Sequence, residues 1–184
     1  MSNELKYGDQ INLKNGYGGG QGGYLDTINN APGAKYGVET ADSPARAKGT
    51  GTWEILSAMG KATGTVVHSG DLIYLRNLYG GDGGYLDTNG YAKQAGAKYD
   101  VTTYATKDRA PGTSRWRIFA QTSTPTDQDI RVGDTVHLWN TYDDNGGFLE
   151  TNGNSTDGDK YDVCTSAYYN RLSADVADWE IQRA

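Results

Sequence analysis

The stretch Gly-Gly-Tyr-Leu-Asp-Thr at residues 22–27 decides the fold, because it does not stand alone. It recurs letter for letter at residues 83–88. A third copy, Gly-Gly-Phe-Leu-Glu-Thr, occupies residues 146–151 and keeps an aromatic ring and an acid. One hexapeptide written three times indicates three internal repeats, and repeats have to be recognised before a fold is assigned.

Three further motifs recur in a constant order around the hexapeptide. Each repeat begins with Gly-Asp, a short alternating run and Asn, as in GDQINLKN from Gly8. After the hexapeptide comes Lys-Tyr-x-Val, as in KYGVET from Lys35, and the repeat ends with Trp-x-Ile. The closing tryptophans, Trp53, Trp116 and Trp179, are 63 residues apart in both intervals. This regular register shows that the repetition extends over nearly the whole chain.

Each motif has the pattern of a β-strand. In the first one, Ile11 and Leu13 alternate with polar residues, which is typical of a strand with one buried face. Glycine, asparagine and aspartate, the common turn formers, separate the motifs. No stretch with a period of 3.6 residues is long enough to predict a helix. Residues 57–69 and 121–131 lie between repeats and are predicted to be connections.

Four strands in each of three repeats predict an all-β fold of twelve strands. We expect one domain over residues 1–184, with repeats at about 1–57, 58–121 and 122–184. Three four-stranded propeller blades are too few to close, and a solenoid needs dissimilar capping repeats. A β-trefoil, with six strands in a closed barrel and six in a cap, fits this count. A twelve-stranded β-prism is the alternative.

Charge and composition exclude several classes of protein. The net charge is −6, divided as −1, +3 and −8 among the three repeats, which disfavours nucleic acid as a partner. A single cysteine, Cys164, permits no intramolecular disulfide. No apolar run approaches the ~20 residues of a membrane span, and the first residues contain no apolar signal-peptide core. We therefore expect synthesis in the cytoplasm without a signal peptide, with release by a non-classical route as an option.

At this point the sequence resembles the β-trefoil lectins. In their ricin-B-type branch, each repeat carries Leu-Asp after a glycine-rich turn and Gln-x-Trp near its end. The first feature is matched by Leu25-Asp26, Leu86-Asp87 and Leu149-Glu150. The second keeps the tryptophan but has Gly51, Ser114 and Ala177 in place of the glutamine. Disulfide-free fungal and bacterial trefoil lectins are the closer match, and the resemblance implies carbohydrate binding.

The repeated polar residues predict where a sugar would bind. If the repeated leucine faces inward, the acid and the ring beside it face outward, next to an Asn-x-Tyr motif just upstream. Carboxylates and amides pair with sugar hydroxyls, and rings cover the apolar face of a pyranose. The candidate ligand-binding residues are Asn15, Tyr17, Tyr24 and Asp26 in the first repeat, Asn77, Tyr79, Tyr85 and Asp87 in the second, and Asn140, Tyr142, Phe148 and Glu150 in the third.

Structural roles for the same residues remain open. The acids could accept hydrogen bonds from turn N–H groups, and the asparagines could end their strands. We expect the tyrosines of the Lys-Tyr motif, Tyr36, Tyr99 and Tyr161, to lie in the core with the tryptophans. The lysines before them, Lys35, Lys98 and Lys160, are expected to pair with nearby acids.

The sequence thus favours a non-enzymatic lectin with up to three glycan sites that binds cell-surface glycans or glycoproteins multivalently. No catalytic set of Ser, His and Asp can be assembled, and His137 is expected at an outward position. No cofactor is predicted. Weak calcium binding at Asp143-Asp144-Asn145 or Asp157-Gly158-Asp159 is a lesser option. The alternative function is a protein-interaction module, such as a protease inhibitor or the receptor-binding part of a toxin.

Overall fold

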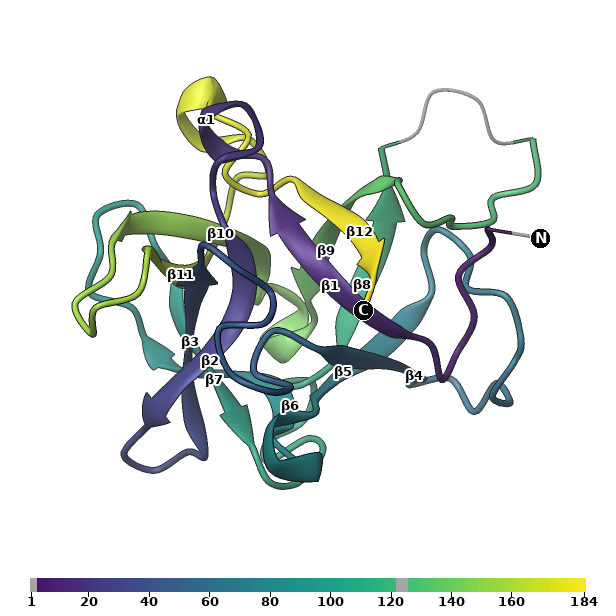
Figure 1. The fold of residues 1–184 in the computed structure, drawn as a ribbon, viewed down its shortest axis with the longest axis horizontal. Coiled ribbons are helices and arrows are strands. Elements are labelled where there is room, and N and C mark those ends of the chain that lie inside the picture. Colours follow the sequence, from purple (N-terminus) through teal and green to yellow (C-terminus); the bar gives the residue numbers. More distant parts are fainter. Residues whose placement is uncertain (1–2, 122–125) are drawn as a thin grey trace.

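The computed structural model describes residues 3–121 and 126–184, and in these residues it is all-β (Figure 1). The predicted number of twelve strands is confirmed, and all twelve belong to one connected sheet. Residues 58–69 form a connection, one residue shorter than expected because Ser57 is the last residue of β4. Part of the predicted connection 121–131 lies outside the described residues.

Each repeat contributes four strands that coincide with the four sequence motifs. The strands are β1 (Gln10–Asn15), β2 (Tyr24–Asn30), β3 (Tyr36–Ala41), β4 (Trp53–Ser57), β5 (Leu72–Asn77), β6 (Gly84–Tyr91), β7 (Tyr99–Tyr104), β8 (Trp116–Ala120), β9 (Thr135–Asn140), β10 (Gly147–Asn154), β11 (Tyr161–Ser166) and β12 (Trp179–Arg183). The helical segments are short: α1 (Tyr17–Gly20), η1 (Tyr79–Gly81), η2 (Tyr142–Asp144) and η3 (Arg171–Ser173). Three of the four begin at the tyrosine of an Asn-x-Tyr motif.

The antiparallel pairings follow the same plan in each repeat. The first and fourth strands of the repeats pair in the sequence β1–β12–β9–β8–β5–β4 and return to β1. Figure 1 shows β1 beside β12, so the two ends of the repeat array meet. The second and third strands form the hairpins β2–β3, β6–β7 and β10–β11, whose third strands also pair with one another.

A single apolar cluster from all three repeats fills the interior. Its largest members are Trp53, Trp116 and Trp179, each with no exposed surface. Each indole N–H donates to the carbonyl of the hexapeptide leucine of its own repeat, over 2.9–3.0 Å; the accepting residues are Leu25, Leu86 and Leu149. The tryptophan therefore ties the end of each repeat to its hexapeptide strand, and the predicted core role of the tryptophans and leucines is confirmed.

Both glycines of the hexapeptide have a structural cause. A Cβ on the first glycine would lie 2.2 Å from the side-chain oxygen of the repeated asparagine; this holds for Gly22, Gly83 and Gly146. The second glycine has a positive φ of 89°, 91° or 97°, which L side chains rarely adopt. The Gly-Gly pair is therefore required by a buried asparagine and a tight turn.

Candidate functional site: three tyrosine pockets

Two tyrosine rings meet wherever one repeat contacts the next. One ring comes from the Lys-Tyr motif of a repeat, and the other from the Asn-x-Tyr motif of the following repeat. The pairs are Tyr36 with Tyr79, Tyr99 with Tyr142, and Tyr161 with Tyr17, at centroid distances of 5.4, 5.5 and 5.3 Å. The rings are inclined at 80°, 81° and 89°, the edge-to-face geometry that aromatic pairs favour.

A hollow lies beside each pair, with a volume of about 310, 250 and 210 Å³ respectively. We call them the first tyrosine pocket (Tyr36, Tyr79, Arg46), the second (Tyr99, Tyr142, Arg109) and the third (Tyr161, Tyr17, Arg171). These volumes lie at or below the lower end of the range of ligand pockets, roughly 300–1,000 Å³. Each pocket therefore suits one small ring rather than an extended ligand.

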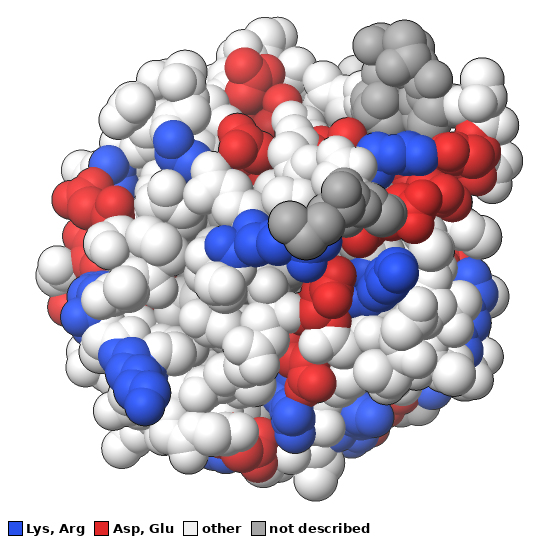
Figure 2. All heavy atoms as spheres, turned by 45° about the vertical axis from the view of Figure 1, so that its right-hand side comes forward, with Lys and Arg blue, Asp and Glu red and all other residues white. Residues whose placement is uncertain are grey.

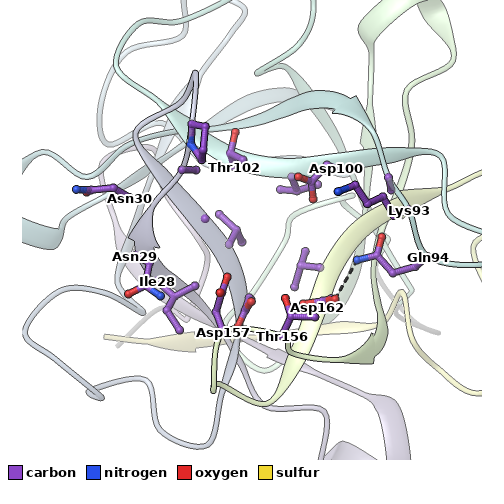
Figure 3. A pocket seen from close by; sticks show the side chains of 18 of the residues that line it. Ile28, Asn29, Asn30, Lys93, Gln94, Asp100, Thr102, Thr156, Asp157 and Asp162 are labelled. Carbon is purple, nitrogen blue, oxygen red and sulfur yellow. Dashed lines mark hydrogen bonds between the residues drawn. The ribbon is translucent and has the colours of Figure 1, made fainter.

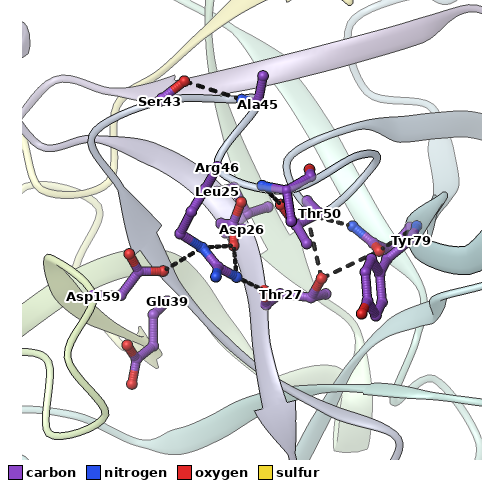
Figure 4. A network of polar contacts seen from close by, with 12 residues as sticks. Leu25, Asp26, Thr27, Glu39, Ser43, Ala45, Arg46, Thr50, Tyr79 and Asp159 are labelled. Atoms are coloured by element: carbon purple, nitrogen blue, oxygen red, sulfur yellow. Dashed lines mark hydrogen bonds and ion pairs between the residues drawn. The ribbon is translucent and has the colours of Figure 1, made fainter.

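An arginine in each pocket is held by the acid of the hexapeptide, and Figure 4 shows this pair in the first pocket. In the first pocket, Nη2 of Arg46 lies 2.7 Å from Oδ1 of Asp26 and donates to the carbonyl of Thr27. The corresponding pairs are Arg109 with Asp87 at 3.1 Å and Arg171 with Glu150 at 2.7 Å. In the first pocket alone, Nε of Arg46 also approaches Asp159, at 3.4 Å.

The three acids are completely buried, so the predicted outward orientation of Asp26, Asp87 and Glu150 is wrong. The alternation of β2, β6 and β10 breaks down because the arginine-bearing loops cover their second face. Burial raises the pKa of all three carboxyl groups, against the lowering effect of the partner arginines. One oxygen of each carboxylate has no hydrogen-bond partner among the described residues. The acids hold the arginines and do not reach the pocket surface.

The bonds to the acid and the neighbouring carbonyl use only part of each guanidinium. Arg46 and Arg171 donate through Nε and Nη2, and Arg109 donates through Nη2. In the described part of the chain, Nη1 of all three has no partner. The arginine side chains keep 38%, 30% and 16% of their surface exposed, so each pocket has a fixed donor at its wall.

The repeated asparagines Asn15, Asn77 and Asn140 are also completely buried, and each is the last residue of its strand, as the structural alternative predicted. The amide of Asn77 donates to the carbonyl of Thr50 over 2.7 Å, and its oxygen accepts from the N–H of Tyr79 over 3.0 Å. The other two asparagines form the same two hydrogen bonds, with lengths that differ by at most 0.1 Å. Each asparagine thus fixes the turn that carries a pocket tyrosine.

The aromatic residues are distributed differently from the expectation. Tyr17, Tyr79 and Tyr142 do line the pockets. The hexapeptide rings Tyr24, Tyr85 and Phe148 are half-buried elsewhere, and line none of the three tyrosine pockets. The predicted core position of Tyr36, Tyr99 and Tyr161 is wrong: they are half-buried, because each lines a pocket.

The sequence alone did not predict these arginines, although a signal exists. An arginine follows the hexapeptide acid after 20, 22 and 21 residues in the three repeats. The first two loops share the motif Arg-Ala-x-Gly-Thr, from Arg46 and from Arg109, but the third loop keeps only the arginine, so this motif does not recur in all three repeats.

A further hollow of about 280 Å³ lies where the three hairpins meet (Figure 3). Acidic side chains from different repeats line it, including Glu39, Asp100, Asp157 and Asp162. Burial, together with the neighbouring aspartates, raises the pKa of Glu39 to about 7. Over residues 3–121 and 126–184, no group of three or more His, Cys, Asp or Glu side chains is arranged to hold a metal ion.

Two further features concern the histidine and the surface. His137 is buried, contrary to its expected outward position, because Nδ1 contacts the carbonyl of Ala177 at 3.0 Å and the ring packs against Phe148. Basic and acidic side chains are interspersed on the face shown in Figure 2. In the described part of the chain, no helix is long and apolar enough to cross a membrane.

No protein-family model and no curated protein sequence matches the chain. Solved structures resemble it in fold. The SDF2-like protein from Arabidopsis thaliana has a TM-score of 0.74 at 18% identity, over 97% of this chain and 94% of that one. A Caenorhabditis elegans protein of unknown function has a TM-score of 0.75 at 12% identity, over 99% and 97%.

The Saccharomyces cerevisiae protein O-mannosyltransferase Pmt1–Pmt2 complex, solved with its sugar donor, has a TM-score of 0.69 at 16% identity. That match covers 98% of this chain but only 25% of the other. At these identities the likeness concerns the fold alone.

Proposed function

We propose that the protein is a non-enzymatic β-trefoil lectin whose glycan sites are the three tyrosine pockets. The observation that carries the proposal is the recurrence of one arrangement, two perpendicular tyrosines beside an acid-held arginine, at all three contacts between repeats. The return of the strand pairings to β1 supports the trefoil assignment. Folding alone does not require half-buried rings and partly unbonded guanidinium groups at three places.

The pocket chemistry suits a neutral sugar. A tyrosine ring covers the C–H face of a pyranose, and the free Nη1 of arginine donates to a hydroxyl or ring oxygen. The acid neutralises the arginine, so a formal charge on the ligand brings no advantage. Hydrogen bonds of this kind contribute about 0.5–1.5 kcal/mol each, which makes a single site weak, around millimolar.

Three weak sites on one rigid chain gain avidity toward a surface that displays many copies of a glycan. The proposed partners are therefore glycans or glycoproteins on such surfaces. In this arrangement the buried Asn15, Asn77 and Asn140 and the three hexapeptide acids are positioning residues behind the sites.

A glycan-array screen of the purified protein tests the proposal. We compare the wild type with the triple variant Tyr17→Ala, Tyr79→Ala, Tyr142→Ala, whose rings are partly exposed and can be removed without opening the core. The matched control is the triple variant Tyr24→Ala, Tyr85→Ala, Phe148→Ala, which removes three half-buried rings outside the pockets. Circular dichroism verifies that both variants fold.

Binding by the wild type that is lost in the first variant and kept in the second supports the proposal. Loss in the second variant alone would return the sites to the hexapeptide strands. Absence of glycan binding by the folded wild type would refute the lectin.

A protein-interaction module is the second candidate function, and a specific feature favours it. Tyr168 and Tyr169 are 70% and 57% exposed, on a loop where the first two repeats have Ser43-Pro44 and Thr106-Lys107. Tyrosine is enriched at protein interfaces. Binding of a protein partner that is lost in Tyr168→Ser, Tyr169→Ser, while glycan binding is absent, would support this function.

A further inference from the structure

The third tyrosine pocket differs from the other two in the loop that follows its arginine. In the first two pockets, the fourth residue after the arginine is a threonine, Thr50 or Thr113. Its carbonyl accepts a hydrogen bond from the backbone N–H of the hexapeptide threonine. In the third pocket, the equivalent residue is Val176, the fifth residue after Arg171. Its carbonyl accepts the equivalent hydrogen bond from the N–H of Thr151 over 3.1 Å. The third loop is therefore one residue longer, and it has a methyl group where the others have a hydroxyl.

The longer loop makes the third pocket more apolar. Leu172, Ala174 and Val176 line it, whereas the corresponding walls of the first and second pockets are formed by an alanine and a threonine. Leu172 is 80% exposed, so most of its side chain lies at the rim of the pocket. Tyr17 lies in the same lining and adds the face of an aromatic ring.

Leu172 has a left-handed backbone conformation, as have Ser173 and Asp175 of the same loop. Its φ is +60°, in the left-handed region that favours glycine, where the first two loops begin with Ala47 and Ala110 at ordinary φ. Non-glycine residues in this region are strained, and such strain concentrates at functional sites. The side chain is also exposed, so it gains little by burial in the free protein. A leucine that is both strained and exposed at a pocket rim gains contacts when a ligand covers it.

We infer that the third tyrosine pocket selects a sugar with a methyl-bearing substituent, such as an acetamido group or a 6-deoxy carbon. The ring would lie against Tyr17 and Tyr161, and the methyl group would contact Leu172 and Val176. This inference rests on the proposed function, since it specifies the ligand class of one of the three sites. The first and second pockets have the smaller Ala47 and Ala110 after their arginines, so we expect them to discriminate less.

The test is a titration of the full chain with matched sugars, followed by NMR with labelled tyrosine rings and leucine and valine methyl groups. The probes are D-galactose with N-acetyl-D-galactosamine, D-glucose with N-acetyl-D-glucosamine, and D-galactose with its 6-deoxy form, D-fucose. The tyrosine signals report binding at each pocket, and the methyl signals report contact with the substituent. We expect about fourfold tighter binding of a methyl-bearing member at the third pocket, the factor that burial of one methyl group brings.

The variant Leu172→Asn removes the apolar rim and tolerates the left-handed backbone. The control, Tyr168→Asn, changes an exposed apolar residue of the same loop that does not line the pocket. Loss of the preference in Leu172→Asn, with the parent sugar still bound and Tyr168→Asn unchanged, supports the inference.

Two outcomes overturn it and can be told apart. Sugars that shift the tyrosine signals of the pockets without any preference at the third pocket refute the inference and leave the lectin intact. Sugars that shift no tyrosine signal in any pocket refute the lectin, and the inference with it.

Discussion

Removing the arginine of the third pocket should destabilise the protein strongly. Glu150 has no exposed surface, and Nε of Arg171 lies 2.7 Å from its Oε1. The change Arg171→Met keeps much of the side-chain volume but leaves a buried carboxylate without its counter-charge. Loss of one partner of such a buried pair costs about 3–5 kcal/mol. In a domain of this size 1 kcal/mol lowers Tm by about 2–4 °C, so we expect a decrease of about 6–20 °C.

Urea and thermal unfolding, followed by circular dichroism, measure this effect for Arg171→Met, Glu150→Gln and the double variant. The double variant should recover at least half of the loss, because the uncompensated charge is gone. The control is Arg183→Met, whose side chain is 51% exposed and 3.5 Å from Asp9; it should cost less than about 1 kcal/mol. A loss in Arg171→Met no larger than in the control, or a double variant as unstable as the sum of the single ones, would refute the reasoning.

Three further outcomes are expected. Asn77→Ala should cost about 2–3 kcal/mol in urea unfolding, because two backbone groups lose their buried partner. Gly84→Ala should lower the free energy of unfolding more than Gly90→Ala. Both glycines have positive φ, but only a Cβ at Gly84 would meet a backbone oxygen, that of Tyr104, at 2.8 Å. Equal losses of stability would show that only the backbone strain of the positive φ matters. Burial raises the pKa of Glu39 to about 7 in the folded state, so the folded state binds the proton of this carboxyl more tightly than the unfolded state does. The free energy of unfolding should therefore fall as pH rises from about 4.5 to 7. Glu39→Gln should reduce this dependence of stability on pH. An unchanged slope in the variant would assign the pH dependence to other groups.

The spacing of the repeats predicted the strands well because each motif has the residue pattern of a strand within itself. Ile11 and Leu13 alternate with polar residues in β1, and Trp53, the first residue of β4, is buried in the core. The glycine-rich turns break the chain at the required points. Such signals depend on a few neighbouring residues and can be recognised in the amino-acid sequence.

The candidate site was harder to predict because the alternation rule assumes that one face of a strand meets water. In β2 the residues from Leu25 to Ile28 are all buried, since the loop that carries Arg46 folds over the second face. An acid expected in solvent therefore lies inside, and its partner comes from a loop 20 residues further along the chain. The tyrosines of the Lys-Tyr motif were placed in the core for a similar reason, because the neighbouring repeat that opens a pocket beside them is distant in sequence.

By itself, the sequence determined the number of repeats, the twelve strands and the residues that close the core, since these follow from local periodicity and turn chemistry. The tertiary structure alone decided which polar residues are buried and which rings reach the surface. That division has a physical cause: each pocket is assembled from two successive repeats, or from the last and the first, as with Tyr161 and Tyr17. The desolvation of a carboxylate and the exposure of a ring edge depend on what the other repeat places against them.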